Sequence, residues 1–333
     1  MDKFESLSSR FDGKQVLYIT TKNLDYIRVT QEIDFLKAHA GALTVIGSKS
    51  KSYPKRLLHV WKCLMAQSMK NIDVGFVGFA PQLVVPFFKG KLKKKQLFID
   101  FFISVYDTMI LDRKKFKDGG IISGLCHKLD EATLKAADAI VCDTKAHGQF
   151  FSEEFGTPID RLYVYYLHAN EAIYHPMDVA QPEGQANSNK KVLYFGSILN
   201  LQGVDVILEA LKEFAADDKI TFEIIGPISD KMQKPMQPNI TYIDWLTQED
   251  LAKHIASADL CLAGHFSGDI MKAKRTIPGK AYIYEAMQKP MILGDGMANH
   301  ELFTNDDKHI FVEMGNPKAL AKAIKDYFDY ERN

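Results

Sequence analysis

The sequence predicts an α/β protein built of two Rossmann-like domains that face each other across a central cleft. Three observations support this prediction. A chain of 333 residues is longer than a domain with one ordinary hydrophobic core. Strand-like and helix-like segments alternate in two successive runs, and a segment at 177–190 that is rich in Pro, Gly, Asn and Gln separates them. We therefore expect a first domain at 1–176, a linker at 177–190 and a second domain at 191–325.

The first half reads as a parallel sheet with helices on both faces. Compact apolar runs predict buried strands at 15–20, 43–47, 73–79, 96–99, 139–143 and 162–166. Apolar residues at helical spacing predict helices at 28–39, 55–70 and 124–137. Alternation of this kind is typical of parallel α/β domains.

The second half repeats the pattern. Strands are predicted at 191–196, 221–226, 240–243, 260–263 and 291–294, and helices at 204–214, 248–257 and 317–328, with 283–287 on a further helix. Ligands of open parallel sheets bind at the carboxyl ends of the strands, so we expect the ligand between the two domains.

Composition and cysteine spacing exclude several classes of protein. Lys+Arg and Asp+Glu both number 42, and the resulting formal charge of zero argues against nucleic acid as a partner. The four cysteines form no C-x-x-C pair and match no zinc spacing, as expected for reduced thiols in a cytoplasmic protein. The polar start predicts no signal peptide, and no apolar run approaches the ~20 residues that span a bilayer.

Missing motifs narrow the chemistry further. No G-x-G-x-x-G follows the first predicted strand, which argues against a dinucleotide dehydrogenase, and no G-x-x-x-x-G-K-[ST] is present, which argues against a P-loop NTPase. No D-x-D occurs, which argues against a sugar transferase that holds its nucleotide through a metal. We therefore expect neither a metal nor a cofactor.

The most informative segment is a basic turn that leads into a helix with one carboxylate. The turn carries Lys272, Lys274, Arg275 and Lys280, and the helix carries Glu285 among apolar neighbours, which predicts a buried carboxylate. A turn that opens a helix offers cations and backbone N–H groups to an anion. Because a carboxylate accepts hydrogen bonds from vicinal hydroxyls, phosphate plus ribose is the matching ligand. The simpler interpretation is a solvated loop and an exposed helix residue.

Glycines and a carboxylate mark the ends of other predicted strands. Gly196 and Gly226 end strands in the second domain, where a side chain would block a phosphate or base, although tight turns also need glycine. Asp100 ends a strand in the first domain and is a candidate functional residue, with Asp107 as its rival and a turn-forming role as the simpler interpretation.

Lone histidines and aromatic residues are expected to be structural. His168 and His265 stand apart from other ligand-type residues, so satisfied structural roles are the preferred interpretation. Tyr242 and Trp245 lie near a predicted strand end, where core packing is preferred over stacking on a base.

A lysine-rich run at 87–95 combines two phenylalanines with Lys89, Lys91, Lys93, Lys94 and Lys95. The simple interpretation is a solvated loop before a strand. The functional interpretation is peripheral contact with the anionic inner face of a membrane, where each nearby lysine contributes ~1 kcal/mol.

The second half resembles the retaining glycosyltransferases of the GT-B fold, in the large branch that carries an E-x(7)-E signature. The resemblance rests on YFGS at 194–197 followed by QGVD at 202–205, FEIIGP at 222–227, and YEAM at 284–287 followed by KPMI at 289–292. In the first half, IDFFISVYDT at 99–108 and AADAIVCDT at 136–144 are also similar to family segments. Together these segments cover most of the chain.

The resemblance implies a hexosyltransferase of polysaccharide or glycan assembly. The second domain of such enzymes binds a nucleotide-diphosphate sugar and the first presents a glycan or lipid-linked acceptor. The sugar is transferred with retention and without metal, and the departing phosphate deprotonates the incoming hydroxyl. Ser197 would lie in the first phosphate turn, and Asp100 near a catalytic or acceptor-orienting position. A tail at 326–333 would cross back to the first domain.

Two departures from the family pattern leave alternatives open. The first Glu of the signature is replaced by Ile277, and the usual cations of the first phosphate turn are replaced by Ser197 and Gln202. We expect Arg275 and Lys280 to supply the missing charge. A nucleotide-sugar epimerase of the same architecture and a catalytically inactive GT-B partner subunit remain the alternatives.

Overall fold

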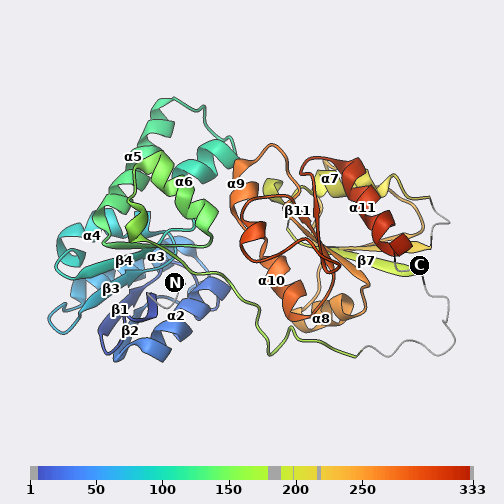
Figure 1. Cartoon of the computed structure of the whole chain (residues 1–333). Helices are drawn as coiled ribbons and strands as arrows, with labels where there is room; N and C mark the ends of the chain where they lie inside the picture. Colours follow the sequence, from blue (N-terminus) through green and yellow to red (C-terminus); the bar gives the residue numbers. More distant parts are fainter. Residues whose placement is uncertain (1–6, 179–188, 198, 216–218, 331–333) are drawn as a thin grey trace. The chain divides into compact units, whose positions relative to one another are not determined.

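The computed structural model describes residues 7–178, 189–197, 199–215 and 219–330. The chain divides into two compact units, residues 1–167 and 168–333, and each contains one parallel six-stranded sheet covered by helices (Figure 1). The two predicted α/β domains are therefore confirmed. The boundary between the two units, at residues 167 and 168, comes earlier than residue 176, where the first domain was predicted to end. The predicted linker 177–190 falls largely on residues 179–188, which lie outside the described residues.

The first sheet has the strand order β2-β1-β3-β4-β5-β6, with every neighbouring pair parallel. Its strands are β1 (Gln15–Ile19), β2 (Ala42–Ile46), β3 (Val74–Val77), β4 (Gln96–Asp100), β5 (Ala139–Cys142) and β6 (Leu162–Val164). The central strands are continuous apolar runs because helices cover both faces of the sheet.

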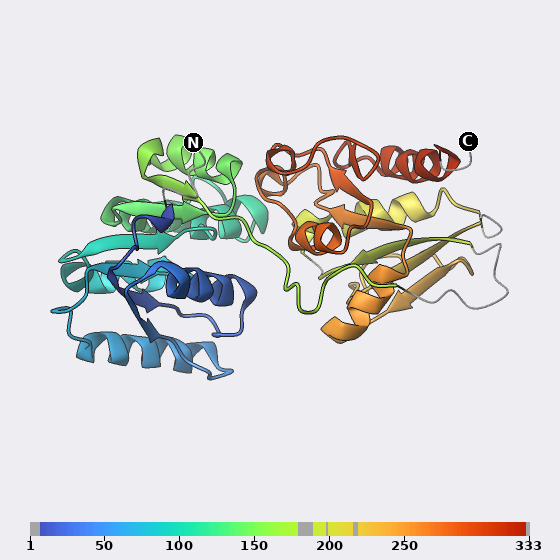
Figure 2. The same cartoon turned by 60° about the horizontal axis from the view of Figure 1, so that its bottom comes forward.

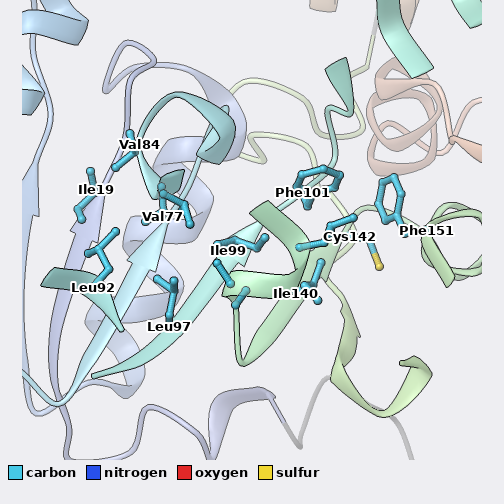
Figure 3. Packing of buried hydrophobic residues seen from close by; sticks show 14 of the residues in the cluster. Ile19, Val77, Val84, Leu92, Leu97, Ile99, Phe101, Ile140, Cys142 and Phe151 are labelled. Atoms are coloured by element: carbon cyan, nitrogen blue, oxygen red, sulfur yellow. The ribbon is translucent and has the colours of Figure 1, made fainter. Parts of the chain in front are cut away.

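One helix packs against one face of this sheet, and the other helices pack against the opposite face (Figures 1 and 2). The α-helices are α2 (Ile27–His39), α3 (Tyr53–Ala66), α4 (Val85–Leu92), α5 (Ile121–Ala136) and α6 (Lys145–Phe155), with a π-helix, η2, at Asp107–Asp112. Val60 of α3, Leu134 of α5 and Phe151 of α6 pack in one core with Leu97 and Ile99 of β4 (Figure 3). Val29 and Leu36 of α2 pack in a second core with Phe11, Phe76 and Phe98.

The second sheet has the strand order β12-β11-β10-β7-β8-β9 and is also parallel throughout. Its strands are β7 (Lys190–Phe195), β8 (Ile220–Ile225), β9 (Ile240–Ile243), β10 (Leu260–Gly264), β11 (Met291–Gly294) and β12 (His309–Val312). The order changes direction at β7: β8 and β9 lie on one side of it, and β10, β11 and β12 lie on the other. The carboxyl ends beside such a reversal are where open α/β sheets bind ligands.

The helices of the second unit are α7 (Val204–Leu211), α8 (Gln248–Ala256), α9 (Met271–Arg275), α10 (Gly279–Ala286) and α11 (Pro317–Tyr330), with a 3₁₀ turn, η4, at Asn200–Gln202. Helices α7 and α11 pack together over one face of the sheet, with Ile207, Leu211, Leu320 and Ile324 in one core (Figure 2). The predicted tail 326–333 differs from the structure, because its residues up to 330 form the last turns of α11. Phe328 is buried in the second unit's core, and residues 331–333 lie outside the described part.

Four elements differ from the sequence prediction. Helix α4 occupies most of the lysine-rich run expected as a loop, and α9 occupies much of the predicted basic turn. Helix α6 was not predicted, because glycine and histidine interrupt its apolar spacing, yet Phe150, Phe151 and Phe155 are buried along it. Strand β12 was not predicted either, since it has only four residues and follows a charged segment.

None of the described helices is both long and apolar enough to cross a membrane.

Limited proteolysis tests the domain organisation. The composition of 177–190 predicts an exposed polar segment between two cores, so the first cleavage is expected there and should leave two fragments that resist further digestion. The fragments are identified by mass spectrometry. A first cleavage within either sheet would contradict the prediction.

Candidate functional site

Glycines at the carboxyl edge of the second sheet allow neighbouring backbone and side-chain atoms to approach closely. Gly226 follows β8 with a φ of +118°, and a Cβ there would lie 2.0 Å from the carbonyl oxygen of Gly196. Gly196 follows β7 and donates its N–H to Ile225 O at 2.9 Å. A Cβ at Gly196 would lie 3.1 Å from Nζ of Lys280, and one at Gly264, which ends β10, would lie 3.8 Å from it. The predicted residues Gly196, Gly226 and Lys280 therefore come together.

Lys280 is a buried cation in the first turn of α10, with 5 % of its surface exposed. Its Nζ donates a hydrogen bond to Oε1 of Gln202 and lies 4.5 Å from the centre of the Tyr194 ring. Among the described residues no carboxylate lies within ion-pair distance of this ammonium group. Buried charges are normally paired, so the position lacks its counter-ion.

Burial lowers the pKa of Lys280 to about 7, because removal from water disfavours the charged form. The amide oxygen of Gln202 and the face of the Tyr194 ring are neutral, so they offset only part of that cost. An anion beside Nζ would favour the charged form and raise the pKa again. The geometry and the electrostatics thus both suit a negatively charged ligand.

Tyr194, in β7, adds a hydrogen-bond donor beside the ammonium group. Its hydroxyl is buried and has no hydrogen-bond partner among the described residues. Burial raises the pKa of Tyr194, so the hydroxyl stays protonated at neutral pH. A Cβ at Gly196 would lie 2.8 Å from this hydroxyl as well as 3.1 Å from Lys280 Nζ. Two donors, the Tyr194 hydroxyl and the Lys280 ammonium, therefore lie close to Gly196 at the end of β7.

The N-terminus of α10 contributes to the same site. Pro278 is the N-cap and no side chain caps the helix. The first N–H groups of a helix have no partner within the helix and, with its dipole, favour an anion. Lys280 stands in this first turn, so one short segment carries both a buried ammonium and a helix N-terminus, two features that suit an anion.

The predicted basic turn contains the short helix α9, which packs against η4, the turn that carries Gln202. Arg275, its last residue, is buried with 8 % exposure, while Lys272 and Lys274 are half-buried. The solvated-loop interpretation is therefore wrong for Arg275. Sequence reasoning found the cations but missed Gln202, Tyr194 and Gly264 as their neighbours.

Glu285 does not join this group. It follows Lys280 by five residues, about 140° around the helix. Its side chain is 55 % exposed and pairs with Nε2 of His309 at 2.8 Å. His309 is the first residue of β12 and pairs with Met291, the first of β11, so Glu285 points to the amino edge of the sheet. The predicted burial of Glu285 is wrong, and ribose binding by it remains an untested prediction.

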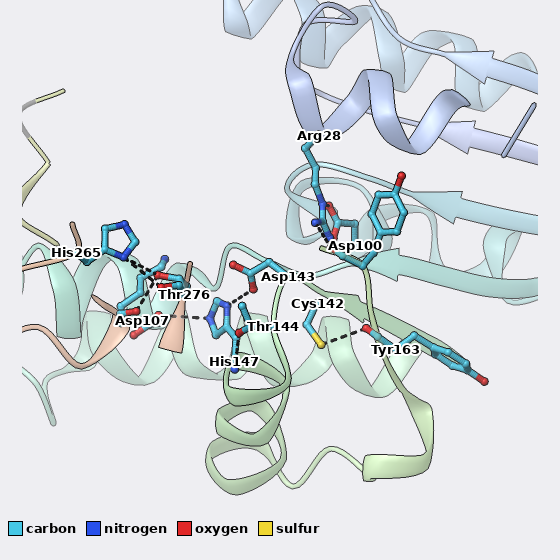
Figure 4. A network of polar contacts seen from close by, with 12 residues as sticks. Arg28, Asp100, Asp107, Cys142, Asp143, Thr144, His147, Tyr163, His265 and Thr276 are labelled. Atoms are coloured by element: carbon cyan, nitrogen blue, oxygen red, sulfur yellow. Dashed lines mark hydrogen bonds and ion pairs between the residues drawn. The ribbon is translucent and has the colours of Figure 1, made fainter. Parts of the chain in front are cut away.

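Other predicted residues of the second unit have clear positions. Ser197 is exposed directly after Gly196. His265 is buried, with Nδ1 3.3 Å from Thr276 O, and its own carbonyl oxygen would lie 2.0 Å from a Cβ at Gly294 (Figure 4). Trp245, expected in the core, is instead 81 % exposed just beyond β9.

Asp100, the predicted catalytic residue of the first unit, forms a buried ion pair. Both of its oxygens accept from Arg28 of α2, at 2.7 and 3.1 Å, and neither side chain is more than 2 % exposed (Figure 4). Arg28 also donates to Tyr165 O at 2.5 Å and lies 3.5 Å from Glu32. Burial raises the pKa of Glu32 well above its usual value. These contacts give Asp100 a structural role, joining α2 to the end of β4, and a catalytic role for it remains untested.

A second polar group lies at the carboxyl edge of the first sheet, and it contains Asp107. The imidazole of His147 lies 2.7 Å from Asp143 through Nδ1 and 3.8 Å from Asp107 through Nε2 (Figure 4). Thr144 caps α6 by accepting from the N–H of His147. The sequence does contain a signal for this group, which the sequence analysis missed: Asp143 ends a predicted strand, and His147 comes four residues later.

The lysine-rich run is partly exposed, and one of its lysines bonds to a neighbouring helix. Lys91 donates to the carbonyls of Leu64 and Met65 at 2.6 and 2.8 Å, and so caps the end of α3. A shallow hollow lined by Lys93, Lys94 and Lys95 also contains Asp73 and Asp138. Within the described ranges no group of three or more His, Cys, Asp or Glu side chains is placed to hold a metal ion.

Comparison with known proteins places the second unit in a sequence family. Residues 189–329 match the family described as "Glycosyl transferases group 1". No curated protein matches the chain significantly in sequence.

Solved structures are similar to the chain over nearly its whole length. Sucrose-phosphate synthase from Thermosynechococcus elongatus has a TM-score of 0.69 at 12% identity, covering 95% of this chain and 90% of that one. HepE from Anabaena, solved with UDP and glucose, has a TM-score of 0.61 at 12% identity, covering 96% and 91%. A glycosyltransferase from Rickettsia africae has a TM-score of 0.55 at 16% identity, covering 96% and 89%. The chain thus has the two-domain GT-B fold, and its second unit matches the glycosyl transferases group 1 family.

Proposed function

We propose that the chain is a glycosyltransferase that uses a nucleotide-diphosphate sugar as its donor. One observation carries the proposal: the buried ammonium of Lys280, without a carboxylate partner in the described structure, lies with the buried Tyr194 hydroxyl close beside Gly196. The family match of residues 189–329 and the UDP complexes of HepE support the nature of the ligand.

The donor's diphosphate would occupy this site. One of its oxygens would accept from Lys280 Nζ and Tyr194 Oη, and another would face the N-terminus of α10. Negative charge grows on the diphosphate as the glycosidic bond breaks, so donors fixed in advance stabilise the transition state more than the bound substrate. Arg275, buried at the end of α9, would add a second cation.

The acceptor is proposed to bind the first unit. A glycan or lipid-linked hydroxyl would be oriented at the carboxyl edge of the first sheet by Asp107 and His147, since Asp100 is already engaged by Arg28. Transfer would proceed with retention and without a metal, the departing phosphate taking the proton of the acceptor hydroxyl.

Product analysis distinguishes this function from its alternatives. A glycosyltransferase incubated with a panel of nucleotide sugars releases free nucleoside diphosphate and, with water as acceptor, slowly releases the sugar. An epimerase instead returns an epimeric sugar, and an inactive subunit turns over none of the panel. Either of the last two results would reject the proposal.

Metal independence is tested by calorimetry. UDP is expected to bind with the same affinity in the presence of a chelator as with added Mg²⁺, because Lys280, Tyr194 and the start of α10 supply the charge and donors. Complete loss of binding in chelator would contradict the metal-free assignment.

Substitution of the cations separates turnover from binding. Lys280→Ala and Arg275→Ala are each expected to lower donor turnover by about a hundredfold or more, since losing one preorganised donor costs about 3 kcal/mol in the transition state. UMP binding should weaken far less. Ser197→Ala, at an exposed residue, serves as the control and should change turnover less than about twofold. If both cation variants keep full turnover, Lys280 and Arg275 are not part of the site.

The pH dependence of donor binding follows from the pKa of Lys280. Because that pKa is lowered to about 7, the ammonium is charged below this pH and loses its proton above it, so affinity should fall as pH rises. A nucleotide-diphosphate sugar is the suitable probe, since its diphosphate is esterified at both ends and does not titrate in this range. Between pH 7 and 8.5 the affinity should fall about tenfold.

Lys280→Arg is the control for that experiment, because a guanidinium stays charged throughout. Its affinity should change little over the same range, even if its absolute value is lower. An identical pH profile in the two proteins would show that another group causes the dependence.

A further inference from the structure

The loop before α5 and the first turns of α5 expose an unusual set of apolar side chains. Ile121 is 87 % exposed, the highest value for a large apolar side chain among the described residues, and Leu125 is 62 % exposed. Ile122 and Phe116 are 43 % and 39 % exposed. Contiguous apolar side chains on a surface commonly mark a site of interaction.

The helix directs these side chains to solvent. At 100° per residue, Ile121, Leu125 and Lys128 lie along one side of α5, and the buried Ser123 and Asp130 lie on the other. The exposed residues therefore form the outer side of an amphipathic helix whose inner side packs on the first unit.

The loop that enters α5 is held in place (Figure 1). Asp118 accepts hydrogen bonds from the N–H of Gly119 at 2.8 Å and from the hydroxyl of Ser123 at 2.9 Å. These bonds lower the pKa of Asp118. The exposed side chains before and after it are thus presented by a fixed turn.

Cations surround the apolar side chains. The exposed basic residues of this segment are Arg113, Lys114, Lys115, Lys117 and Lys128, and none forms an ion pair within the described structure. Asp118, already bonded to the turn, is the sole carboxylate in residues 113–128. The chain as a whole is neutral, so this local excess of positive charge is a property of the segment.

We propose that this basic apolar surface, formed by residues 113–128, docks on an anionic lipid bilayer. Phe116, Ile121, Ile122 and Leu125 would enter the boundary between headgroups and acyl chains, and the long basic side chains would reach the lipid phosphates around them. Charge complementarity favours this occupant: exposed apolar side chains flanked in sequence by long, flexible cations match a fluid anionic surface, whereas a protein partner would have to supply matching carboxylates and pockets. The 16-residue helix would lie on the bilayer.

The proposal moves the predicted membrane contact from the lysine-rich run to α5. Lys91 caps α3, and Lys93, Lys94 and Lys95 share their hollow with Asp73 and Asp138, so that run offers less free charge. The α5 surface contains no residue assigned to the donor site, so it stands independently of the proposed function.

Co-sedimentation with lipid vesicles tests the proposal on the full chain. Binding is expected to vesicles that contain phosphatidylglycerol, not to phosphatidylcholine alone, and to weaken steeply with salt. The double variant Ile121→Ser/Leu125→Ser should lower the partition coefficient about tenfold or more, from the loss of inserted apolar area. Lys114→Gln/Lys115→Gln should weaken binding and reduce its salt dependence.

A matched control lies on α3, where Leu58 and Met65 are 54 % and 62 % exposed. Leu58→Ser/Met65→Ser should leave vesicle binding unchanged, and Lys93→Gln/Lys94→Gln should do the same. All variants change exposed side chains, and unchanged thermal unfolding and UDP binding would verify their fold.

Three results would overturn the proposal. They are absence of binding to anionic vesicles, equal loss of binding in the α3 control, and wild-type self-association that Ile121→Ser/Leu125→Ser abolishes. The last result, seen by sedimentation velocity, would identify the surface as an interface between copies of the chain.

Discussion

The candidate site depends on a cation, Lys280, that the fold holds out of water with no carboxylate partner among the described residues. Lys280 is kept in place by the start of α10, by Gln202 after β7 and by the ring of Tyr194 within β7. A buried ammonium with only neutral neighbours costs stability unless something compensates it. Burial lowers the pKa of Lys280, and an anionic ligand bound beside Nζ would offset the cost of that burial, which would link the stability of this edge of the sheet to ligand binding.

Glycine makes that arrangement possible. Gly226 needs its positive φ and the absence of a Cβ because the Gly196 carbonyl lies against it, and Gly294 needs the same absence because of the His265 carbonyl. Glycine therefore allows the loops after the strands to pack closely around Lys280 and Tyr194.

Much of this could be predicted from the sequence, because both sheets are parallel and buried strands are continuous apolar runs. Even short strands such as β9 and β11 were placed at their observed limits. The same reasoning failed where local pattern and tertiary contact disagree. The sequence around α10 does not show that Lys280 is buried and that Glu285 is exposed. The burial of each residue depends on which side of α10 packs against the sheet, and that is decided by tertiary contacts. Likewise, the lysines of α4 read as a solvated loop, although Lys91 reaches the end of α3.

Binding of a diphosphate between Lys280 and Tyr194 can be seen in a crystal structure of the full chain soaked with UDP. The expected result is a phosphate oxygen within hydrogen-bond distance of both Lys280 Nζ and Tyr194 Oη, beside Gly196. A diphosphate bound elsewhere on the chain, with the Lys280–Gln202 contact undisturbed, would contradict it.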